Sequence, residues 1–535
     1  MKLNLSFLFI GISVLGLGAC SGGGDSSRCV PGSGVNVTVS GSITFDRVPL
    51  TDSGALDFPA ASVEPARKIT VEAVCNSVLT STTSDDNGNY SLSVPAGTTG
   101  LVVRAKAQMQ QSGNPGWDVR VVDEQQAVEL VFALDSSPLN VDAARSLNLH
   151  APSGSDGTRY TSARTAAPFA ILDTVYKSMQ LILSSQPTVN FPALTIEWSE
   201  SNSAGSYYIN QTISLYGYSI DTDEYDEHVI AHEWGHYFQD MFSRDDSIGG
   251  PHSGGDILDI RVAFSEGFGN AFSAMVLDDP LYRDSQGLDR GFTLDIESNS
   301  CTNDGWYNEC SVQSVLYDFY DISNEGGFDV FDLGFDEIYQ VLVDADKLRD
   351  SDAFTSLFSF INVFKRLPVM DGLETSVDNL LNEQSINVSI IDGYGTGATA
   401  AGGGSNIPTP PYLPGADVFS GVEEVCSSGI NGGYNGLGVS RYVSFSVLSS
   451  TNYTITAQRA TGLNPADPDM YLYHKGELLA VAETWRADTD SLSASLQVDK
   501  EYVLEVREYG YTDPSYDPTA TGATNTTCFT VTRTP

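Results

Sequence analysis

The sequence is poor in basic residues and in histidine. It has 27 Lys and Arg against 69 Asp and Glu, giving a formal net charge of -42 at pH 7, and only 6 histidines. A surface of this sign repels phosphates rather than neutralising them, so nucleic acid is excluded as a partner. We interpret the acidity as a solubility feature. At 535 residues the chain exceeds what one hydrophobic core usually organises, so several domains are expected.

Long apolar runs are also missing, except at the N-terminus, where Leu5 to Leu17 follow Lys2. The run ends in a small-residue segment before Cys20, which resembles a bacterial lipoprotein processing site. The resemblance implies a signal peptide at 1–20, a lipid on Cys20 as the only membrane attachment, and a tether at 21–34. Ser21 after the cysteine resembles the signal for the outer membrane. The alternative is an ordinary signal peptide in which Cys20 is incidental.

Besides Cys20 the chain has six cysteines, an even number that suggests up to three disulfides in an oxidising compartment. Six cysteines allow about fifteen pairings. Cys301 with Cys310 and Cys426 with Cys528 are plausible from their positions, which leaves Cys29 with Cys75.

Two stretches at either end alternate apolar and polar residues in the manner of short strands. In residues 35–140 an Asp-rich turn at 85–89 precedes Tyr90, and this segment resembles carboxypeptidase regulatory-like β-sandwich domains. Residues 416–535, with Val443 and Phe445 on one strand face, resemble the pre-peptidase β-sandwich domains of secreted bacterial peptidases. Residues 396–415 are rich in Gly and Pro and indicate a linker.

The middle of the chain, residues 141–395, changes to helical periodicity. Pro168 fits the first turn of a helix, and a strand pair is expected at 194–198 and 207–215. Further helices are expected at 312–320, 335–343, 354–364 and 373–381. The predicted fold class is therefore multidomain: a central α+β zincin-like catalytic domain between two all-β sandwich domains.

The chemistry is predicted on a helix that starts in the acidic segment 221–224 and contains His232-Glu233-Trp234-Gly235-His236. Histidines four residues apart share one helical face, so both can reach one ion. Glu233 lies beside them, where it can take a proton from an activated water. The sequence predicts a zinc site with His232 and His236 as metal ligands and Glu233 as general base.

A hydrolytic zinc needs a third protein ligand and one open position. A metzincin would need glycine and histidine where Gln239 and Phe242 stand, so that class is excluded. Glu266 lies in a segment with small residues at helical spacing, which would let its helix pack closely on the metal helix. Asp256 and Asp259 are fallback ligands, as an aspzincin-like site would require.

With Glu266 as third metal ligand, the chain resembles the gluzincins, the thermolysin-like superfamily. In thermolysin-type members an Asp four residues further supports a metal histidine; here that residue is Asn270, whose amide can still accept a hydrogen bond. The resemblance also implies a Tyr or His near the developing oxyanion. Tyr317 is the first candidate and His252 the second, whereas His228 is expected to support or cap the helix.

The predicted function is an exported zinc metallopeptidase in the cell envelope that acts on a protein or peptide substrate. The substrate would extend along an edge strand, either 207–209 or 212–215. Two alternatives stay open: a catalytically inactive surface-binding lipoprotein, and a metal-dependent hydrolase of another bond. Ca²⁺ is a second candidate ion, from the number of carboxylates alone. The sequence leaves the oligomeric state open.

Overall fold

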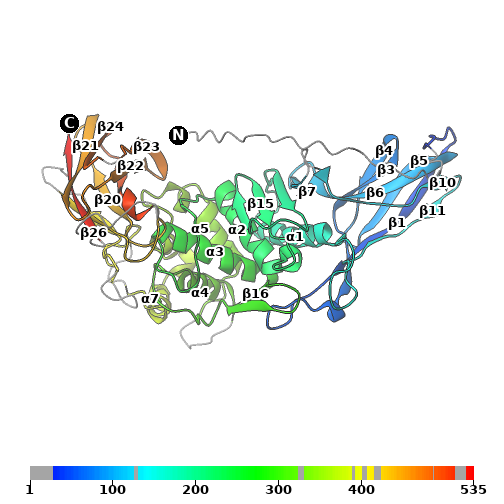
Figure 1. The fold of residues 1–535 in the computed structure, drawn as a ribbon, viewed down its shortest axis with the longest axis horizontal. Coiled ribbons are helices and arrows are strands. Elements are labelled where there is room, and N and C mark those ends of the chain that lie inside the picture. The colour runs from blue at the N-terminus through cyan, green and yellow to red at the C-terminus, as the bar shows by residue number, and fades with distance from the viewer. Residues whose placement is uncertain are drawn as a thin grey trace, which may run out of the picture.

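The computed structural model describes residues 28–125, 130–322, 330–387, 392–399, 407–414, 423–485, 487–512 and 526–535. The expected signal peptide and residues 21–27 of the tether lie outside this part. Figure 1 shows three regions in a row: a β-rich N-terminal region, a helical middle and a β-rich C-terminal region. Within the described residues, no helix combines the length and apolarity needed to cross a bilayer.

The N-terminal region consists of strands whose alternating residues are buried, as the sequence pattern predicts. In β3, for example, Ile69, Val71 and Ala73 face the core, and the residues between them are only partly covered. The elements are β1 (Asn36–Arg47), η1 (Phe58–Ala60), β2 (Ser62–Pro65), β3 (Ile69–Cys75), β4 (Ser77–Thr83), β5 (Asn89–Pro95), β6 (Thr98–Gln111), β7 (Trp117–Asp123), β8 (Leu130–Val131), β9 (Ala133–Asp135), β10 (Leu139–Val141), β11 (Arg145–Ser146) and β12 (Leu149–Ala151).

This region does not stop at the predicted boundary after residue 140. One path of strands runs β14-β15-β13-β7-β6-β3-β4, and β7 pairs in parallel with β13 (Leu194–Trp198) of the middle region. A single hydrophobic cluster contains both Val121 of β7 and Ile196 of β13. Without β13, β7 would leave its backbone groups unpaired along an edge, so the middle region completes the sheet.

The middle region contributes seven helices from the described residues. Its elements are α1 (Ala167–Ser185), β14 (Tyr207–Ile209), β15 (Thr212–Leu215), η2 (Asp223–Tyr225), α2 (Glu227–Phe242), α3 (Ile260–Leu277), β16 (Leu281–Ser285), β17 (Gly291–Asp295), α4 (Glu309–Tyr320), α5 (Phe335–Val343), η3 (Leu348–Asp350), α6 (Leu357–Phe364), η4 (Pro368–Met370) and α7 (Glu374–Glu383). Pro168 lies in the first turn of α1, as predicted. Helix α2, which carries His232 and His236, begins at Glu227, later than the predicted start, because residues 223–225 form a separate 3-10 turn.

The C-terminal region is a β-sandwich of two sheets with its own hydrophobic core, which confirms the predicted architecture there. Its elements are β18 (Tyr412–Pro414), β19 (Glu423–Ser428), β20 (Ser440–Ser446), β21 (Thr451–Thr461), β22 (Pro468–His474), β23 (Glu477–Ala482), β24 (Thr489–Leu496), β25 (Glu501–Glu508), η6 (Tyr509–Tyr511) and β26 (Thr526–Thr534). Part of the predicted linker belongs to this sandwich, since β18 pairs with β20 and Tyr412 is buried.

The described residues contain three disulfides, and each joins two cysteines that the sequence suggested as a pair. Cys29 bonds Cys75, Cys301 bonds Cys310, and Cys426 bonds Cys528. The last pair joins neighbouring strands β19 and β26 of the sandwich. The middle pair lies beside the candidate site.

Candidate metal centre

Helix α2 places two imidazoles on one face. Its other face packs Trp234 and Phe238 against Phe272 of α3, which fixes the rotation of the helix. The Nε2 atoms of His232 and His236 therefore point to the same spot and lie 3.0 Å apart.

Glu266 of α3 reaches the same spot. Its Oε2 atom lies 3.3 Å from Nε2 of His232 and 3.2 Å from Nε2 of His236. Donor atoms around one tetrahedral zinc, at bond lengths of about 2.0–2.2 Å, are separated by roughly 3.4 Å. The three predicted ligands fit a zinc ion both in chemistry and in spacing.

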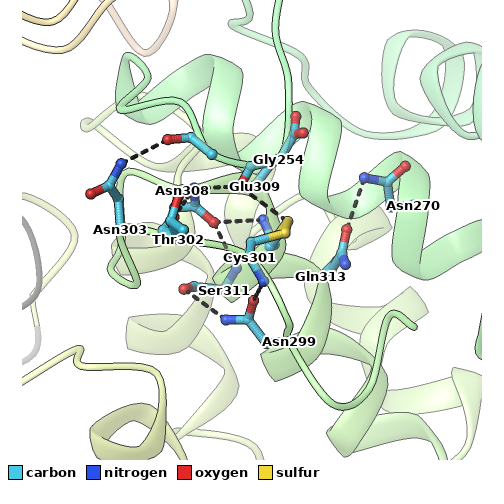
Figure 2. Close-up of a disulfide and its surroundings, with 12 residues drawn as sticks. Gly254, Asn270, Asn299, Cys301, Thr302, Asn303, Asn308, Glu309, Ser311 and Gln313 are labelled. Atoms are coloured by element: carbon cyan, nitrogen blue, oxygen red, sulfur yellow. Dashed lines mark hydrogen bonds between the residues drawn. A yellow bond between two sulfur atoms is a disulfide. The ribbon is translucent and has the colours of Figure 1, made fainter. Parts of the chain in front are cut away.

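A second layer of polar groups orients the two imidazoles. Nδ1 of His232 lies 2.8 Å from Oδ1 of Asn270, whose Nδ2 donates to Oε1 of Gln313 at 2.9 Å (Figure 2). Nδ1 of His236 lies 3.2 Å from Oγ of Ser265. An acceptor at Nδ1 keeps the proton on that atom and leaves the Nε2 lone pair for a metal.

Two glycines allow α2 and α3 to approach this closely. A Cβ atom on Gly269 would lie 2.8 Å from Cε1 of His232, so the imidazole occupies the space of a missing side chain. A Cβ atom on Gly235 would lie 3.4 Å from Cα of Gly269. Gly269 thus makes room for the His232 ring, although it is not one of the small residues that the sequence pattern placed in the stripe; of those, Gly267 packs against Val312 of α4.

Glu233 lies beside the ligands in a cavity of about 600 Å³ that is also lined by His232, His252, Asn270 and Tyr282. Burial raises the pKa of Glu233, although the neighbouring imidazoles work in the opposite direction. The pKa of Glu266 is held well below its usual range, because the charge of His236 and hydrogen bonds from the imidazoles outweigh burial. The two carboxylates therefore suit different roles: Glu233 takes up a proton more readily, and Glu266 stays charged.

His252, the second candidate for the oxyanion, also faces this centre. Its Nε2 lies 3.2 Å from Oε2 of Glu266, and its Nδ1 lies 2.6 Å from Oε2 of Glu309. Burial alone would lower the pKa of His252, but hydrogen bonds to these two carboxylates raise it to about 11. The imidazole is therefore held as a cation that can donate.

The loop that carries His252 is fixed by the start of α4. The Asn308 side chain caps this helix and donates to the Gly254 carbonyl at 2.9 Å, as Figure 2 shows. The Cys301–Cys310 disulfide lies against the same glycine, where a Cβ atom would be 2.8 Å from both sulfurs. The nearby disulfide thus supports the loop that presents the imidazole.

Tyr317, the first candidate for the oxyanion, is placed elsewhere. It lies two turns beyond Glu309 along α4, packs against Tyr320, and is not among the residues that line the cavity. Three aromatic residues that the sequence did not mark line the cavity instead: Tyr282 of β16, Tyr216 and Phe292. Tyr282 lies in a short polar segment without a motif, so no local signal marked it.

The remaining candidates do not join the three ligands. His228 points its Nε2 to the Asp279 carbonyl at 3.1 Å, consistent with the expected supporting role. Asp259 caps α3 and pairs with Arg261. Among the described residues the group at this centre is His232, His236 and Glu266, without Asp256 or Asp259.

The family described as Mycolysin C-terminal domain matches residues 181–355. The matched segment contains α2, α3, His252 and Glu309, and it relates the chain to peptidase-associated proteins. A search of curated proteins found no match.

Three solved structures illustrate the structural matches. The pre-peptidase C-terminal domain of collagenase from Bacillus anthracis is 14% identical, over 23% of this chain and 92% of that one, with a TM-score of 0.15. The periplasmic lysozyme inhibitor PliG from Aeromonas hydrophila is 8% identical, over 23% and 96%, with a TM-score of 0.14. A beta-glucosidase from Paenibacillus barengoltzii is 15% identical, over 23% and 10%, with a TM-score of 0.12. Similarity at this level carries no argument about fold or activity.

Proposed function

We propose that this chain is an exported zinc metallopeptidase of the gluzincin type. The observation that carries the proposal is the convergence of His232, His236 and Glu266 at zinc spacing, with Glu233 and His232 lining one cavity. The family match over this segment supports peptidase chemistry over another hydrolysis.

Zinc bound there would supply a Lewis acid that polarises the scissile carbonyl and lowers the pKa of a water to about 7. Glu233 takes the proton from this water and passes it to the leaving amine. Its burial suits this role, because a carboxylate with a raised pKa accepts a proton more readily near neutral pH.

His252 takes the role first expected of Tyr317. Its Nε2 atom lies 3.2 Å from the Glu266 carboxylate, and Glu309 fixes its ring through Nδ1. A cationic donor at this point stabilises the negative oxygen that develops during attack. Changing His252 to Ala should lower kcat by about 10²–10³-fold while zinc stays bound.

The substrate lies along β14. This strand is one end of the ten-stranded sheet, whereas β15 is enclosed between β14 and β13. Tyr207 and Ile209 on β14 are exposed, and Gly205 and Ser206 just before it line the cavity. An extended peptide that adds to this edge would pass the metal centre.

The deciding experiment compares Glu233→Gln with the matched surface variant Glu477→Gln in casein cleavage, with and without a chelator. We expect Glu233→Gln to keep zinc and lose about 10²–10⁴-fold in activity, and Glu477→Gln to behave as the unchanged chain. Full activity in Glu233→Gln, or activity that survives complete removal of zinc, would refute the mechanism.

A chain that binds zinc but cleaves neither casein nor a peptide library would instead be the inactive surface-binding lipoprotein. Anchoring belongs to the proposal as well: the lipid on Cys20 would hold the protein in the cell envelope, at the outer membrane. A Cys20→Ser variant should then leave the membrane fraction.

A further inference from the structure

A second group of acidic residues lines the cavity that His232 and Glu233 also line. Asp221 and Asp223 come from the segment before α2, and Asp284 comes from β16. One carboxylate oxygen from each lies within 4.8 Å of the others. Tyr282, two residues before Asp284 on β16, lines the same cavity, and its ring centre lies 6.5 Å from that of His232.

One oxygen of each of these carboxylates is buried without a hydrogen-bond partner, although Oδ2 of Asp223 accepts from the Ser206 hydroxyl. Asp223 is 4% exposed, and the Oδ1 atoms of Asp221, Asp223 and Asp284 are all buried with no hydrogen-bond partner. Asp226 beside them is fully buried, and its Oδ1 atom also has no partner. Leaving several carboxylate oxygens unpaired away from water is costly unless a cation compensates them.

No protein cation compensates them. In the part of the chain that the structure describes, no Lys, Arg or His forms an ion pair with any of these four carboxylates, and Arg283 next to Asp284 pairs with Asp279 instead. Burial raises the pKa of Asp221 to about 6, and burial together with the charge of Asp221 raises that of Asp284 to about 7. The group is therefore short of positive charge.

We propose that Asp221, Asp223 and Asp284 bind a calcium ion. The ligand set is all oxygen, which suits a hard cation and not a second zinc. Calcium binds oxygen at about 2.3–2.6 Å, so ligand atoms on opposite sides of it are roughly 5 Å apart, compatible with the spread of these oxygens.

The ion would fasten β16 to the start of the metal helix. Hydrogen bonds already join the two segments, because the Ser285 amide donates to Oδ2 of Asp226 at 2.5 Å and Oγ of Ser285 donates to the Thr222 carbonyl at 3.1 Å. A calcium ion shared by Asp223 and Asp284 would complete this junction and hold Tyr282 in the cavity.

The rival occupant is a Lys or Arg side chain of the substrate. The unpaired Oδ1 atoms have almost no exposed surface, so a side chain that enters through the cavity would not reach them in this arrangement. An ion held among the carboxylates needs no such access, which is why the structure favours calcium.

The experiment titrates Ca²⁺ into the full, zinc-loaded chain from which other divalent ions have been removed. We expect one Ca²⁺ per chain by calorimetry, a rise of several degrees in Tm, and Tb³⁺ luminescence sensitised by the nearby Tyr282. Asp223→Asn with Asp284→Asn should abolish all three effects, whereas the exposed Asp289→Asn should keep them. The single Asp284→Asn, a milder change, should weaken Ca²⁺ binding at least tenfold if the double variant does not fold.

Several results would overturn the proposal. The first is that the chain does not bind Ca²⁺ at millimolar concentration. The second is that Asp284→Asn binds Ca²⁺ as the unchanged chain does. The third is that Asp284→Asn loses cleavage next to Lys and Arg while Ca²⁺ changes neither Tm nor activity, which would assign the carboxylates to the substrate. Because the Glu233→Gln variant should bind Ca²⁺ normally, failure of this site is distinguishable from failure of the peptidase proposal.

Discussion

The middle and the first turn of helix α3 are held in opposite ways. Toward the metal centre, α3 meets its neighbours through absent side chains: Gly269 receives the His232 ring, and a Cβ on Gly267 would lie 2.6 Å from Cβ of Val312 on α4. Toward its first turn, α3 is held by charge, with Arg261 buried between Asp259 and Glu505 of the C-terminal sandwich.

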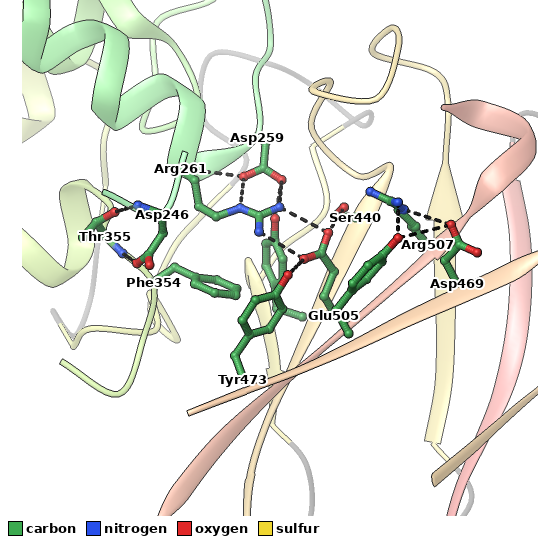
Figure 3. Close-up of polar contacts among 12 residues, drawn as sticks. Asp246, Asp259, Arg261, Phe354, Thr355, Ser440, Asp469, Tyr473, Glu505 and Arg507 are labelled. Atoms are coloured by element: carbon green, nitrogen blue, oxygen red, sulfur yellow. Dashed lines mark hydrogen bonds and ion pairs between the residues drawn. The ribbon is translucent and has the colours of Figure 1, made fainter. Parts of the chain in front are cut away.

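The charged end is a closed network, shown in Figure 3. Arg261 is 1% exposed and donates to both oxygens of Glu505, at 3.0 and 3.2 Å. Ser440 and Tyr473 also donate to Glu505, and the Tyr442 hydroxyl donates to Asp259. The guanidinium lies over the Phe354 ring, 4.8 Å from its centre.

The C-terminal sandwich therefore helps to position the candidate site. Arg261 lies five residues before Glu266 on the same helix, so the orientation of Glu266 depends on contacts with β25. The ion pair between Arg261 and Glu505 is buried, which ties the sandwich to this helix.

The largest effect is expected from Arg261→Met. It leaves Glu505 buried and unpaired, which should lower the free energy of unfolding by about 3–5 kcal/mol, measured by urea denaturation. Replacing all three charged groups, as in Arg261→Met with Glu505→Met and Asp259→Asn, should recover most of the loss, because neither Glu505 nor Asp259 then stays buried as a charge without its cation. A loss below about 1 kcal/mol in the single variant would show that the network does not hold the helix.

The packing at the glycines in the middle of α3 is tested by Gly269→Ala. The new Cβ would push the His232 ring away from the centre, and we expect zinc affinity to fall by about 10–100-fold in a chelator competition assay. Folding should not suffer equally, since Ala favours a helix by up to about 1 kcal/mol over Gly. The control is Gly433→Ala, whose Cβ would meet nothing within 4 Å. Equal zinc affinity in both variants would contradict the packing argument.

A smaller and opposite effect is expected from Asn270→Asp. A carboxylate in place of the amide makes His232 a more basic ligand, so zinc should bind up to about tenfold tighter. Gln313 can adapt, because its Nε2 atom is buried without a partner and could donate to the new carboxylate. The isosteric loss of the bond in Asn270→Leu should weaken zinc instead. If Asn270→Asp and Asn270→Leu change zinc affinity in the same direction, the hydrogen bond to His232 does not control zinc binding.

The same contrast explains what the sequence could predict. His232, His236 and Glu266, the small residues around them and the role of Asn270 follow from helical spacing, and the structure places them together. The pairing of Arg261 with Glu505 spans 244 residues, and no periodicity in either segment marks the partner. The join of β7 with β13 across the predicted boundary is likewise set by long-range pairing.

Tyr317 shows a subtler limit. Tyr317 lies on the same helical face as Gln313, and Gln313 does contact Asn270. The helical pattern therefore predicts correctly which face of α4 is turned toward the site. Four residues further along the helix correspond to about 6 Å, enough to carry the ring past the centre. How far a helix slides along its neighbour is decided by packing, here by Gly267 against Val312, and not by its own pattern.

The smallest effect is expected at a second ion pair across the same interface. Lys475 in the sandwich lies 2.6 Å from Asp350 of the middle region, but these side chains are 34% and 56% exposed. Water and salt screen such a pair, so Lys475→Met should cost less than about 1 kcal/mol, and less still at high salt. Methionine keeps the length of the side chain, which limits the change to the charge. Urea denaturation in parallel with Arg261→Met measures both pairs on one scale. A cost above about 2 kcal/mol for Lys475→Met would mean that exposed ion pairs stabilise the interface as much as buried ones. The contrast between the buried ion pair at the first turn of α3 and the glycine packing in its middle would then no longer describe how this helix is held.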